Sequence, residues 1–383
     1  MTTAGDRLRD ERGIALLIVL IIVALLTITV VEFTYSVQID QHRTRNAIHA
    51  LQSQLLARSG INLAEGFLML DEEPAFDSYS EDWWLQLVEF CDELPLDESM
   101  RIKCRVKDES GKINVNNTRE PKRNVAGQAV TVSAVLRDAI KCLFSKRGID
   151  VEIVDKLADY WQQDPGQKSD GTQAGIPDFG SLEDFAATFG ITGEEVHSLR
   201  NVLTAQPRRV LGKINVNTAN VEVLAAVLDA EQVPNCSPNE AVEQIVARQQ
   251  DIENPFRNAG EVKAVFGGID NANIKGLVFD TKSSLYRLEA SALSNVDPEN
   301  PLSGGIGQTL TVLVSRRQGD KPRGGEQRQG ADGKPLPNWT LRALDWQKEG
   351  GARLFRPAAT DDSNLPGNPD SQEDDTDGAE LDR

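Results

Sequence analysis

The chain opens with a strongly apolar stretch, which is followed by a region of helical periodicity. Ile14–Val31 contains 18 residues and no charged side chain. As a helix it would span about 27 Å at a rise of about 1.5 Å per residue, close to the thickness of the hydrocarbon core of a bilayer. No proline lies between Ile14 and Asp71, and apolar residues keep an approximate helical stripe as far as Leu68. We therefore expect one helix from Ile14 to about Leu70, whose outer half packs against a folded head.

Strand-like alternation of apolar and polar residues occurs in four later segments. These are Met100–Val106, Leu285–Leu293, Gln308–Ser315 and Trp339–Trp346. The last two flank a stretch rich in Gly, Pro and Gln, which we expect to form a long hairpin loop. The four strands predict a small, mainly antiparallel sheet against the long helix.

Between Asn124 and Ser283, and thus between the first and second of these strands, the periodicity is helical. Three pairs at helix-capping spacing mark predicted helix starts: Ser181 with Asp184, Thr192 with Glu195, and Ser237 with Glu240. The region has about 160 residues, which is enough for a core of its own. The predicted fold class is α+β: a long N-terminal membrane-spanning helix packed on a small antiparallel sheet, with a large all-α domain inserted between strands.

These patterns divide the chain into eight segments. A charged N-terminal segment occupies residues 1–13, the transmembrane helix 14–34, and its continuation outside the membrane 35–72. The sheet takes residues 73–123 and 284–356, the latter with a hairpin loop at 316–338. Two helical halves occupy 124–211 and 212–283, and an acidic tail without a predicted fold occupies 357–383.

One hexapeptide, GKINVN, occurs twice, at Gly111–Asn116 and Gly212–Asn217. In each copy Ile and Val alternate with Lys and Asn. The second copy runs into an apolar helical stripe, for which Asn217 or Thr218 is a suitable N-cap. Both copies stand at boundaries of the helical halves, so we interpret them as joints where the chain enters each half.

The charge and the reactive side chains exclude several functions. The net charge is −18, and the segment Pro357–Arg383 supplies about −8 of it, from nine acids and one arginine. An acidic chain is repelled by nucleic-acid phosphates unless it carries a local basic patch. The four cysteines form no CxxC pair, which argues against a zinc site. There are three histidines and no dinucleotide-binding loop, so we predict that the protein is not an enzyme.

The residues around the apolar run indicate a membrane anchor and its orientation. Arg7, Arg9 and Arg12 precede it, which predicts a single pass with the N-terminus in the cytoplasm and the body outside. A buried core helix and a cleaved secretory signal are the alternatives. The signal is disfavoured because the run ends in Glu32-Phe33-Thr34, without a small-x-small cleavage site.

A charged leader that ends in Arg12-Gly13 and abuts an apolar helix resembles the type IV pilin-like prepilins. The resemblance implies cleavage by prepilin peptidase between Gly13 and Ile14, usually with methylation of the new amine. Most of these proteins have Glu at the fifth mature position, where this chain has Ile18. The minor pseudopilin K of type II secretion lacks that glutamate, and the order of anchor, sheet, helical insert and the INVNTA stretch is also similar to it.

This resemblance implies a location and a set of partners. The protein would lie in the bacterial inner membrane, with its body in the periplasm, at the tip of a pseudopilus that drives export of folded proteins. Minor pseudopilins I and J and the major pseudopilin would be its partners, and prepilin peptidase its processing enzyme. The helical halves would be SAM-like, and nucleic acid would not be a ligand.

Calcium is the one cofactor that the sequence and the resemblance suggest. A turn-rich loop carries Asp164, Asp170 and Asp178, and carboxylates on such a loop suit calcium. The family's Gly-Ala-Glu pattern after this loop is not matched here, and a solvated loop is the alternative. The periplasm also permits disulfides, and Cys91 with Cys104, 13 residues apart, is a candidate pair.

The rival hypothesis is a membrane-anchored DNA-binding protein of the competence or type IV pilus kind. The stretch that begins at Ile214 also resembles the start of a helix-hairpin-helix module. Such a module holds phosphate with backbone N–H groups of a Gly-x-Gly hairpin. The corresponding turn here, Val233–Ser237, has no glycine, and Phe266–Ile269 is the nearest substitute.

Overall fold

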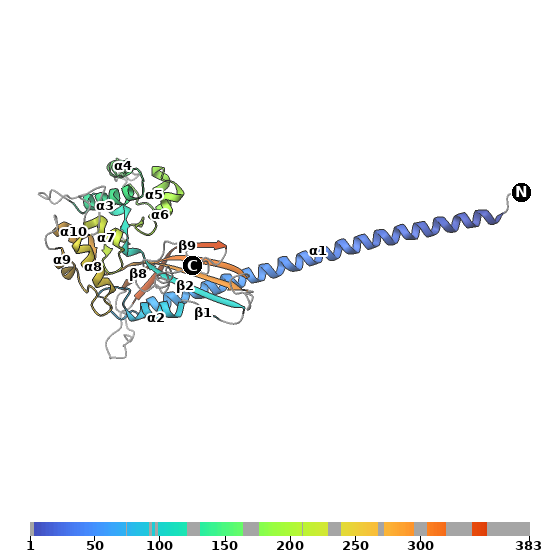
Figure 1. Cartoon of the computed structure of the whole chain (residues 1–383), viewed down its shortest axis with the longest axis horizontal. Coiled ribbons are helices and arrows are strands. Elements are labelled where there is room, and N and C mark those ends of the chain that lie inside the picture. The colour runs from blue at the N-terminus through green and yellow to red at the C-terminus, as the bar shows by residue number, and fades with distance from the viewer. Residues whose placement is uncertain are drawn as a thin grey trace, which may run out of the picture.

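A single long helix projects from a head that combines a sheet with a helical part (Figure 1). The computed structural model describes residues 4–73, 75–91, 94–95, 99–120, 131–163, 176–208, 210–228, 239–266, 272–294, 305–318 and 339–350. The sheet lies beside the C-terminal part of the long helix. The helical part lies at the end of the sheet that is farther from the N-terminus (Figure 1).

The long helix, α1 (Ala4–Leu68), changes its surroundings along its length. It begins ten residues before the expected start, since the leader residues Asp6–Arg12 are themselves mostly good helix formers. The apolar run is exposed on all sides, whereas Ala57, Ile61 and other residues of the last turns are fully buried. A single continuous helix therefore serves both as a membrane-spanning rod and as part of the core of the head.

Close packing of α1 on the sheet depends on Gly60. A Cβ atom at this position would lie 2.9 Å from the Cβ of Ala290 and 3.0 Å from a methyl group of Ile102. Both neighbours belong to strands of the sheet. Gly60 therefore marks the closest approach of helix and sheet, and it does not break the helix.

The sheet has five described strands in the order β1-β2-β7-β8-β9, and all its pairings are antiparallel. The strands are β1 (Leu94–Pro95), β2 (Met100–Asp108), β7 (Leu285–Ser294), β8 (Ile306–Gln318) and β9 (Trp339–Gly350). The central neighbours β2 and β7 pair from Met100↔Ser294 to Asp108↔Tyr286. Residues 109–284 are thus inserted between two neighbouring strands, and the α+β prediction is confirmed.

The core of the sheet part lies between α1 and one face of the sheet. A second helix, α2 (Asp82–Cys91), closes this core with Trp83 and Trp84, which are 5% and 6% exposed. The inward-facing positions of β2, β7 and β8 complete it. This arrangement explains the alternation seen in the sequence, because every second strand residue faces α1.

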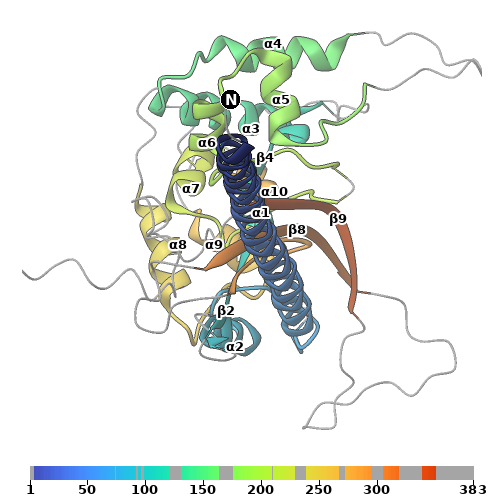
Figure 2. The same ribbon diagram turned by 90° about the vertical axis from the view of Figure 1, so that its right-hand side faces the viewer.

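The helical part contains eight described α-helices around a core of its own. They are α3 (Val132–Lys146), α4 (Glu152–Gln162), α5 (Leu182–Phe189), α6 (Gly193–Leu199), α7 (Val221–Leu228), α8 (Glu240–Gln250), α9 (Ala259–Val265) and α10 (Ala272–Val278). Viewed from the end of α1, the head is much wider than the helix that carries it (Figure 2).

Two of the three predicted helix caps are confirmed and one is wrong. Ser181 caps α5, and Thr192 forms a capping box with Glu195 at the start of α6, as expected. The prediction of Ser237 was wrong, because Asn239 caps α8 by accepting the N–H of Val242.

The start of α7 also differs from the expectation. Asn220 accepts the N–H of Val223 there, so neither Asn217 nor Thr218 is the cap. Both of those side chains are used in tertiary contacts instead.

The hairpin loop begins later than the predicted position 316. Strand β8 continues to Gln318, which pairs with Trp339. The chain stays in the sheet because Arg316 is buried and holds several partners described below. The rest of that loop and the acidic tail lie outside the described residues.

Candidate functional site

The two GKINVN copies occupy equivalent places in the helical part. In the first copy, β3 (Ile113–Asn114) pairs in parallel with β4 (Leu203–Thr204). In the second, β5 (Ile214–Asn215) pairs in parallel with β6 (Phe279–Asp280). Each copy therefore opens one half of the insert and pairs with the strand that ends it. Ile113 and Val115 lie in the helical core, whereas the sequence-based division placed them with the sheet.

The first asparagine of each copy folds the backbone back on itself. The side-chain oxygen of Asn114 accepts the N–H of Asn116, and that of Asn215 accepts the N–H of Asn217. All four residues are buried, so each turn satisfies an N–H group that water cannot reach.

The second asparagine of each copy clamps a phenylalanine through its backbone. Asn116 accepts the N–H of Phe179 at 2.8 Å and donates to its carbonyl at 3.0 Å. Asn217 makes the same pair of bonds with Phe256, at 3.0 and 2.9 Å. An amide is required because the contact needs one acceptor and one donor on the same side chain. The repeated sequence is therefore one structural device, used once in each half.

The start of the first copy also touches the residues that directly follow the second copy. A Cβ atom on Gly111 would lie 2.6 Å from the backbone oxygen of Thr218 and 3.0 Å from the backbone nitrogen of Ala219. The equivalent glycine of the second copy, Gly212, has nothing within 4 Å of such an atom. The halves thus meet where the first copy begins and the second ends.

A buried polar network joins the second copy to the sheet. The Asn215 amide donates to the backbone oxygen of Asp77 at 2.9 Å and to the hydroxyl of Ser283 at 2.6 Å. Asp108, the last residue of β2, accepts from the hydroxyls of Thr218 and Ser283. Burial raises the pKa of Asp108, and these hydroxyl donors oppose the shift.

Arg316 ties the end of α1 to the same network. Its guanidinium donates to Asp71 at 2.8 Å, to Asp77, and to the hydroxyl of Tyr286 at 2.8 Å. It also lies 4.3 Å from the ring centre of Trp339. Burial lowers the pKa of Arg316 to about 10, so the side chain stays charged at neutral pH.

A second buried ion cluster stands beside the joint. Glu109 accepts from Lys112 at 2.7 Å and from Arg287 at 2.8 Å. Burial by itself would raise the pKa of Glu109, but the two cations outweigh it and hold the value at about 2. Lys112 belongs to the first repeat and Arg287 to β7, so this cluster also connects the helical part to the sheet.

The predicted processing site lies in the exposed part of α1. Gly13, Ile14 and Ile18 are helical, and the side chains of Ile14 and Ile18 are 60% and 53% exposed. Among the described residues, α1 is the one helix long and apolar enough to cross a membrane. These observations place the three residues where the sequence expects a membrane anchor to begin.

The calcium prediction falls mostly on residues whose structure is not described. Asp164 and Asp170 lie outside the described ranges, but Asp178 is described. It accepts the N–H of Arg208 at 3.0 Å and lies 3.4 Å from that guanidinium and 3.9 Å from that of Arg119. Its charge is thus compensated by arginines. The described ranges contain no group of three or more His, Cys, Asp or Glu residues that could hold a metal.

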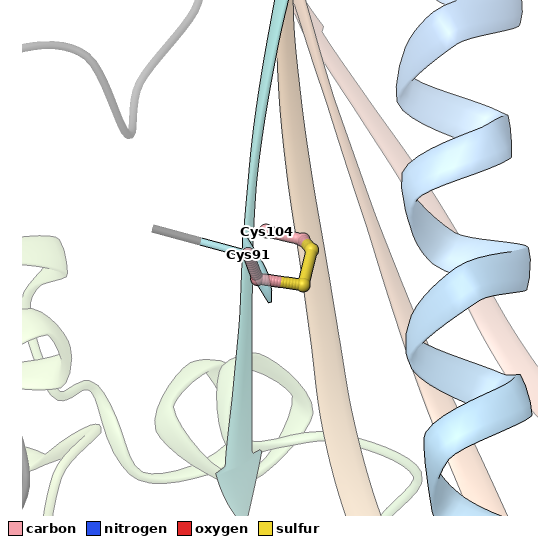
Figure 3. Close-up of a disulfide and its surroundings, with 2 residues drawn as sticks. All are labelled: Cys91 and Cys104. Atoms are coloured by element: carbon pink, nitrogen blue, oxygen red, sulfur yellow. A yellow bond between two sulfur atoms is a disulfide. The ribbon is translucent and has the colours of Figure 1, made fainter. Parts of the chain in front are cut away.

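Cys91 and Cys104 are joined by a disulfide, with their Cα atoms 4.8 Å apart (Figure 3). The bond connects the end of α2 to the middle of β2, beside α1. Both half-cystines belong to the core of the sheet part. The disulfide therefore fixes α2 over the sheet.

The sequence pattern gave no sign of the buried roles of Arg316 and Asp77. Arg316 opens a run of Gly, Pro and charged residues, which looked like a loop. Of the segments compared with a DNA-binding hairpin, 233–237 and 267–269 lie outside the described ranges. Phe266, which is described, is buried in the helical core.

An exposed apolar helix that continues into a helix packed on an antiparallel sheet defines the architecture as pilin-like. This example carries a helical domain between neighbouring strands.

The sequence is similar to type II secretion system protein K of Pseudomonas aeruginosa, with 29% identity over 243 residues, 58% of this chain and 70% of that protein. The predicted resemblance to pseudopilin K is confirmed by this relative. No family model matches the chain. A solved structure, the GspK–GspI–GspJ complex of the type 2 secretion system from enterotoxigenic Escherichia coli, aligns with a TM-score of 0.49 and 16% identity. The alignment covers 80% of this chain and 99% of that one.

Proposed function

We propose that this chain is the K-type minor pseudopilin of a type II secretion system and occupies the tip of the pseudopilus. It would be anchored in the bacterial inner membrane by α1, with its N-terminus in the cytoplasm and its head in the periplasm. There it would start and cap the assembly that exports folded proteins. Its role would be architectural, without catalysis.

The position of the helical part carries this proposal. It lies beyond the end of the sheet that is farther from the membrane-spanning segment (Figure 1). Hydrogen bonds attach it there, from Thr218 to Asp108 and from Asn215 to the backbone oxygen of Asp77, whose carboxylate accepts from Arg316. A wide, rigidly held head above a thin helix would fill the space that the next subunit needs.

The apolar residue at position 18 agrees with a subunit at the top of the filament. In pilin-like filaments a glutamate at this place is thought to neutralise the amine of the adjacent subunit. A carboxylate without such a partner in the membrane is costly. A subunit with none above it has no use for the acid, and Ile18 is apolar.

Processing can be tested directly. We expect prepilin peptidase to cleave between Gly13 and Ile14, and the intact mass of protein from membranes would show it. Gly13→Ala should reduce cleavage partly, and Gly13→Asp should abolish it. A mature N-terminus at any residue other than Ile14 would contradict the pilin-like assignment.

The partners follow from the resemblance and can be tested by assembly. The full chain in detergent should form a complex with the minor pseudopilins I and J. In the pseudopilus, the major pseudopilin should form the shaft below this complex. Size exclusion at tens of micromolar, with all three proteins folded, is the measurement. Absence of a complex would count against the proposal, as would a shift of duplex DNA by this chain at physiological salt.

The tip position has its own experiment. In a strain that lacks the native copy, the intact Ile18→Glu protein should still label only one end of each pseudopilus by immunogold microscopy. A variant that combines Ile18→Glu with deletion of residues 125–283 should enter the shaft. Shaft label from intact Ile18→Glu would refute the steric argument. End label from both variants would mean that head bulk does not set the position.

A further inference from the structure

One cysteine in the core of the helical part is bonded to another cysteine. Cys142 lies on α3 with no exposed surface, among the residues of that core. Its sulfur takes part in a disulfide, and no cysteine of the described residues is free. The chain has four cysteines, and Cys91 is joined to Cys104. Cys236 is therefore the one cysteine of the chain that remains as a partner for Cys142.

The packing of α3 on α7 brings the chain that leads to Cys236 to the level of Cys142. These are the first helices of the two halves, and they pack along each other (Figure 1). Arg147, just after the end of α3, pairs with Glu222 in the first turn of α7, so the two helices run in opposite directions. Cys142 lies five residues before Arg147, or about 7.5 Å at about 1.5 Å per residue. The end of α7 lies six residues beyond Glu222, or about 9 Å, and so reaches the same level.

The segment after α7 is long enough to complete the bond. Cys236 is eight residues beyond Leu228, a stretch that can span up to about 26 Å. A disulfide needs Cα atoms within about 4.4–6.8 Å of each other. Leu228 is held in place, because its carbonyl accepts from Lys275 of α10, a helix that also contacts α3. The end of α7 is thus a fixed point from which the chain can reach Cys142 without moving either helix.

We propose that a second disulfide, between Cys142 and Cys236, joins the two halves of the helical part and forms before their common core closes. The two thiols lose two protons and two electrons, which a disulfide of a thiol–disulfide oxidoreductase accepts as it becomes a dithiol. That enzyme has to reach the sulfur, and Cys142 is 0% exposed once the core is complete. The bond therefore precedes the packing of α3 on α7, and the folded core then protects it from reduction.

The proposed bond closes a long loop across the two halves. Its ends are 94 positions apart (236 − 142) and enclose the second GKINVN copy. In the chain-entropy model, a loop of about 100 residues raises the folding equilibrium constant roughly a thousandfold. Because thiols stay reduced in the cytoplasm, the helical part completes its fold only after the head has left that compartment. This inference does not rest on the proposed secretion role.

Peptide mapping of the full chain, purified from membranes in detergent without a reductant, tests the pairing. Free thiols are blocked before digestion with trypsin. We expect residues 142–146 to be linked to 214–248, and residues 59–101 to 104–105. Each cysteine lies on a different tryptic peptide, so mass alone distinguishes the possible pairings. A maleimide added after unfolding should label no thiol before reduction and all four after it.

Substitutions test whether the two cysteines act as one unit. Cys236→Ala should lower the folding equilibrium constant of the full chain roughly a thousandfold in denaturant unfolding. Adding Cys142→Ala should lower it by less than about tenfold more, because the bond is already lost and only the packing of one sulfur remains to be removed. The matched control is Cys91→Ala with Cys104→Ala, which removes the other disulfide and should leave the Cys142–Cys236 link in place.

Several distinct results would overturn the proposal. One is maleimide labelling of Cys142 and Cys236 in the unfolded chain before reduction. Another is a link from Cys142 to Cys91 or Cys104. Mixing chains of two isotopic compositions identifies a third, in which Cys142 is joined only to a different chain. Full additivity of the two alanine substitutions would contradict a single shared bond. Reduction of the folded protein by dithiothreitol faster than the helical part unfolds would contradict its closure in the core.

Discussion

Replacement of Gly111 by alanine tests whether the start of the first repeat must touch the turn that follows the second repeat. The added Cβ atom would meet the backbone oxygen of Thr218 at 2.6 Å, its carbonyl carbon at 2.8 Å and the nitrogen of Ala219 at 3.0 Å. These are backbone atoms of a turn that Asn215 and Thr218 hold by hydrogen bonds. The turn cannot move aside without breaking those bonds, unlike the far end of a flexible side chain.

The expected loss follows from overpacking of a rigid contact. Such changes destabilise a protein by about 1–3 kcal/mol. For domains of 150–250 residues this corresponds to a fall in the melting temperature of roughly 2–12 °C, at about 2–4 °C per kcal/mol. Thermal unfolding of the full chain in detergent, followed by circular dichroism, is the assay.

Gly212 provides a matched control in the second repeat. It is followed by the same five residues as Gly111, but no atom lies within 4 Å of an added Cβ. Gly212→Ala should therefore be neutral or should stabilise the protein by up to about 1 kcal/mol through the unfolded state. Equal effects of the two substitutions, or no loss for Gly111→Ala, would refute the claim that the halves are in rigid contact there.

Three further predictions concern the buried polar groups and the disulfide. Asn217→Ala should destabilise the protein by about 2–4 kcal/mol in denaturant unfolding, because the backbone groups of Phe256 lose both partners; a loss below 0.5 kcal/mol would show that the clamp is dispensable. Because its pKa is about 2 in the folded protein and 4.5 unperturbed, Glu109 should contribute on the order of 3 kcal/mol above pH 4.5. That contribution should disappear as the pH falls toward 2, and Glu109→Gln should flatten the acid limb of a stability–pH curve; an unchanged limb would contradict this. Reduction of the Cys91–Cys104 disulfide should lower the free energy of unfolding by about 3 kcal/mol, since it releases a loop of about 15 residues. A Cys91→Ser variant with the same melting temperature as the oxidised protein would refute this prediction.

Burial also predicts a pH dependence of stability at Glu81, directly before α2. Burial, followed by the nearby charge of Asp71, raises the pKa of Glu81 to about 9. The folded protein therefore keeps a proton that the unfolded chain has released above pH 4.5, so this group makes stability fall as the pH rises from 4.5 to 9. Glu81→Gln should remove part of that fall in the same stability–pH measurement.

The sequence by itself determined the elements whose pattern is local. The apolar run fixed α1, because 18 uncharged residues without proline form a helix in any surroundings that exclude water. Alternation fixed β2, β7 and β8, because one face of each strand must be buried. The helix caps at Ser181 and Thr192 could be predicted because their hydrogen bonds join residues only three positions apart.

Only the tertiary structure decided what the repeated asparagines and Arg316 do. Asn217 could have capped a helix by its sequence, yet its amide is used by Phe256, 39 residues away. Arg316 stands in a loop-like sequence but is buried against Asp71, 245 residues earlier. A local pattern cannot reveal such partners, because a buried polar group is stable wherever the fold brings a complementary group within hydrogen-bond distance. The joint between sheet and helical part is built from these long-range contacts.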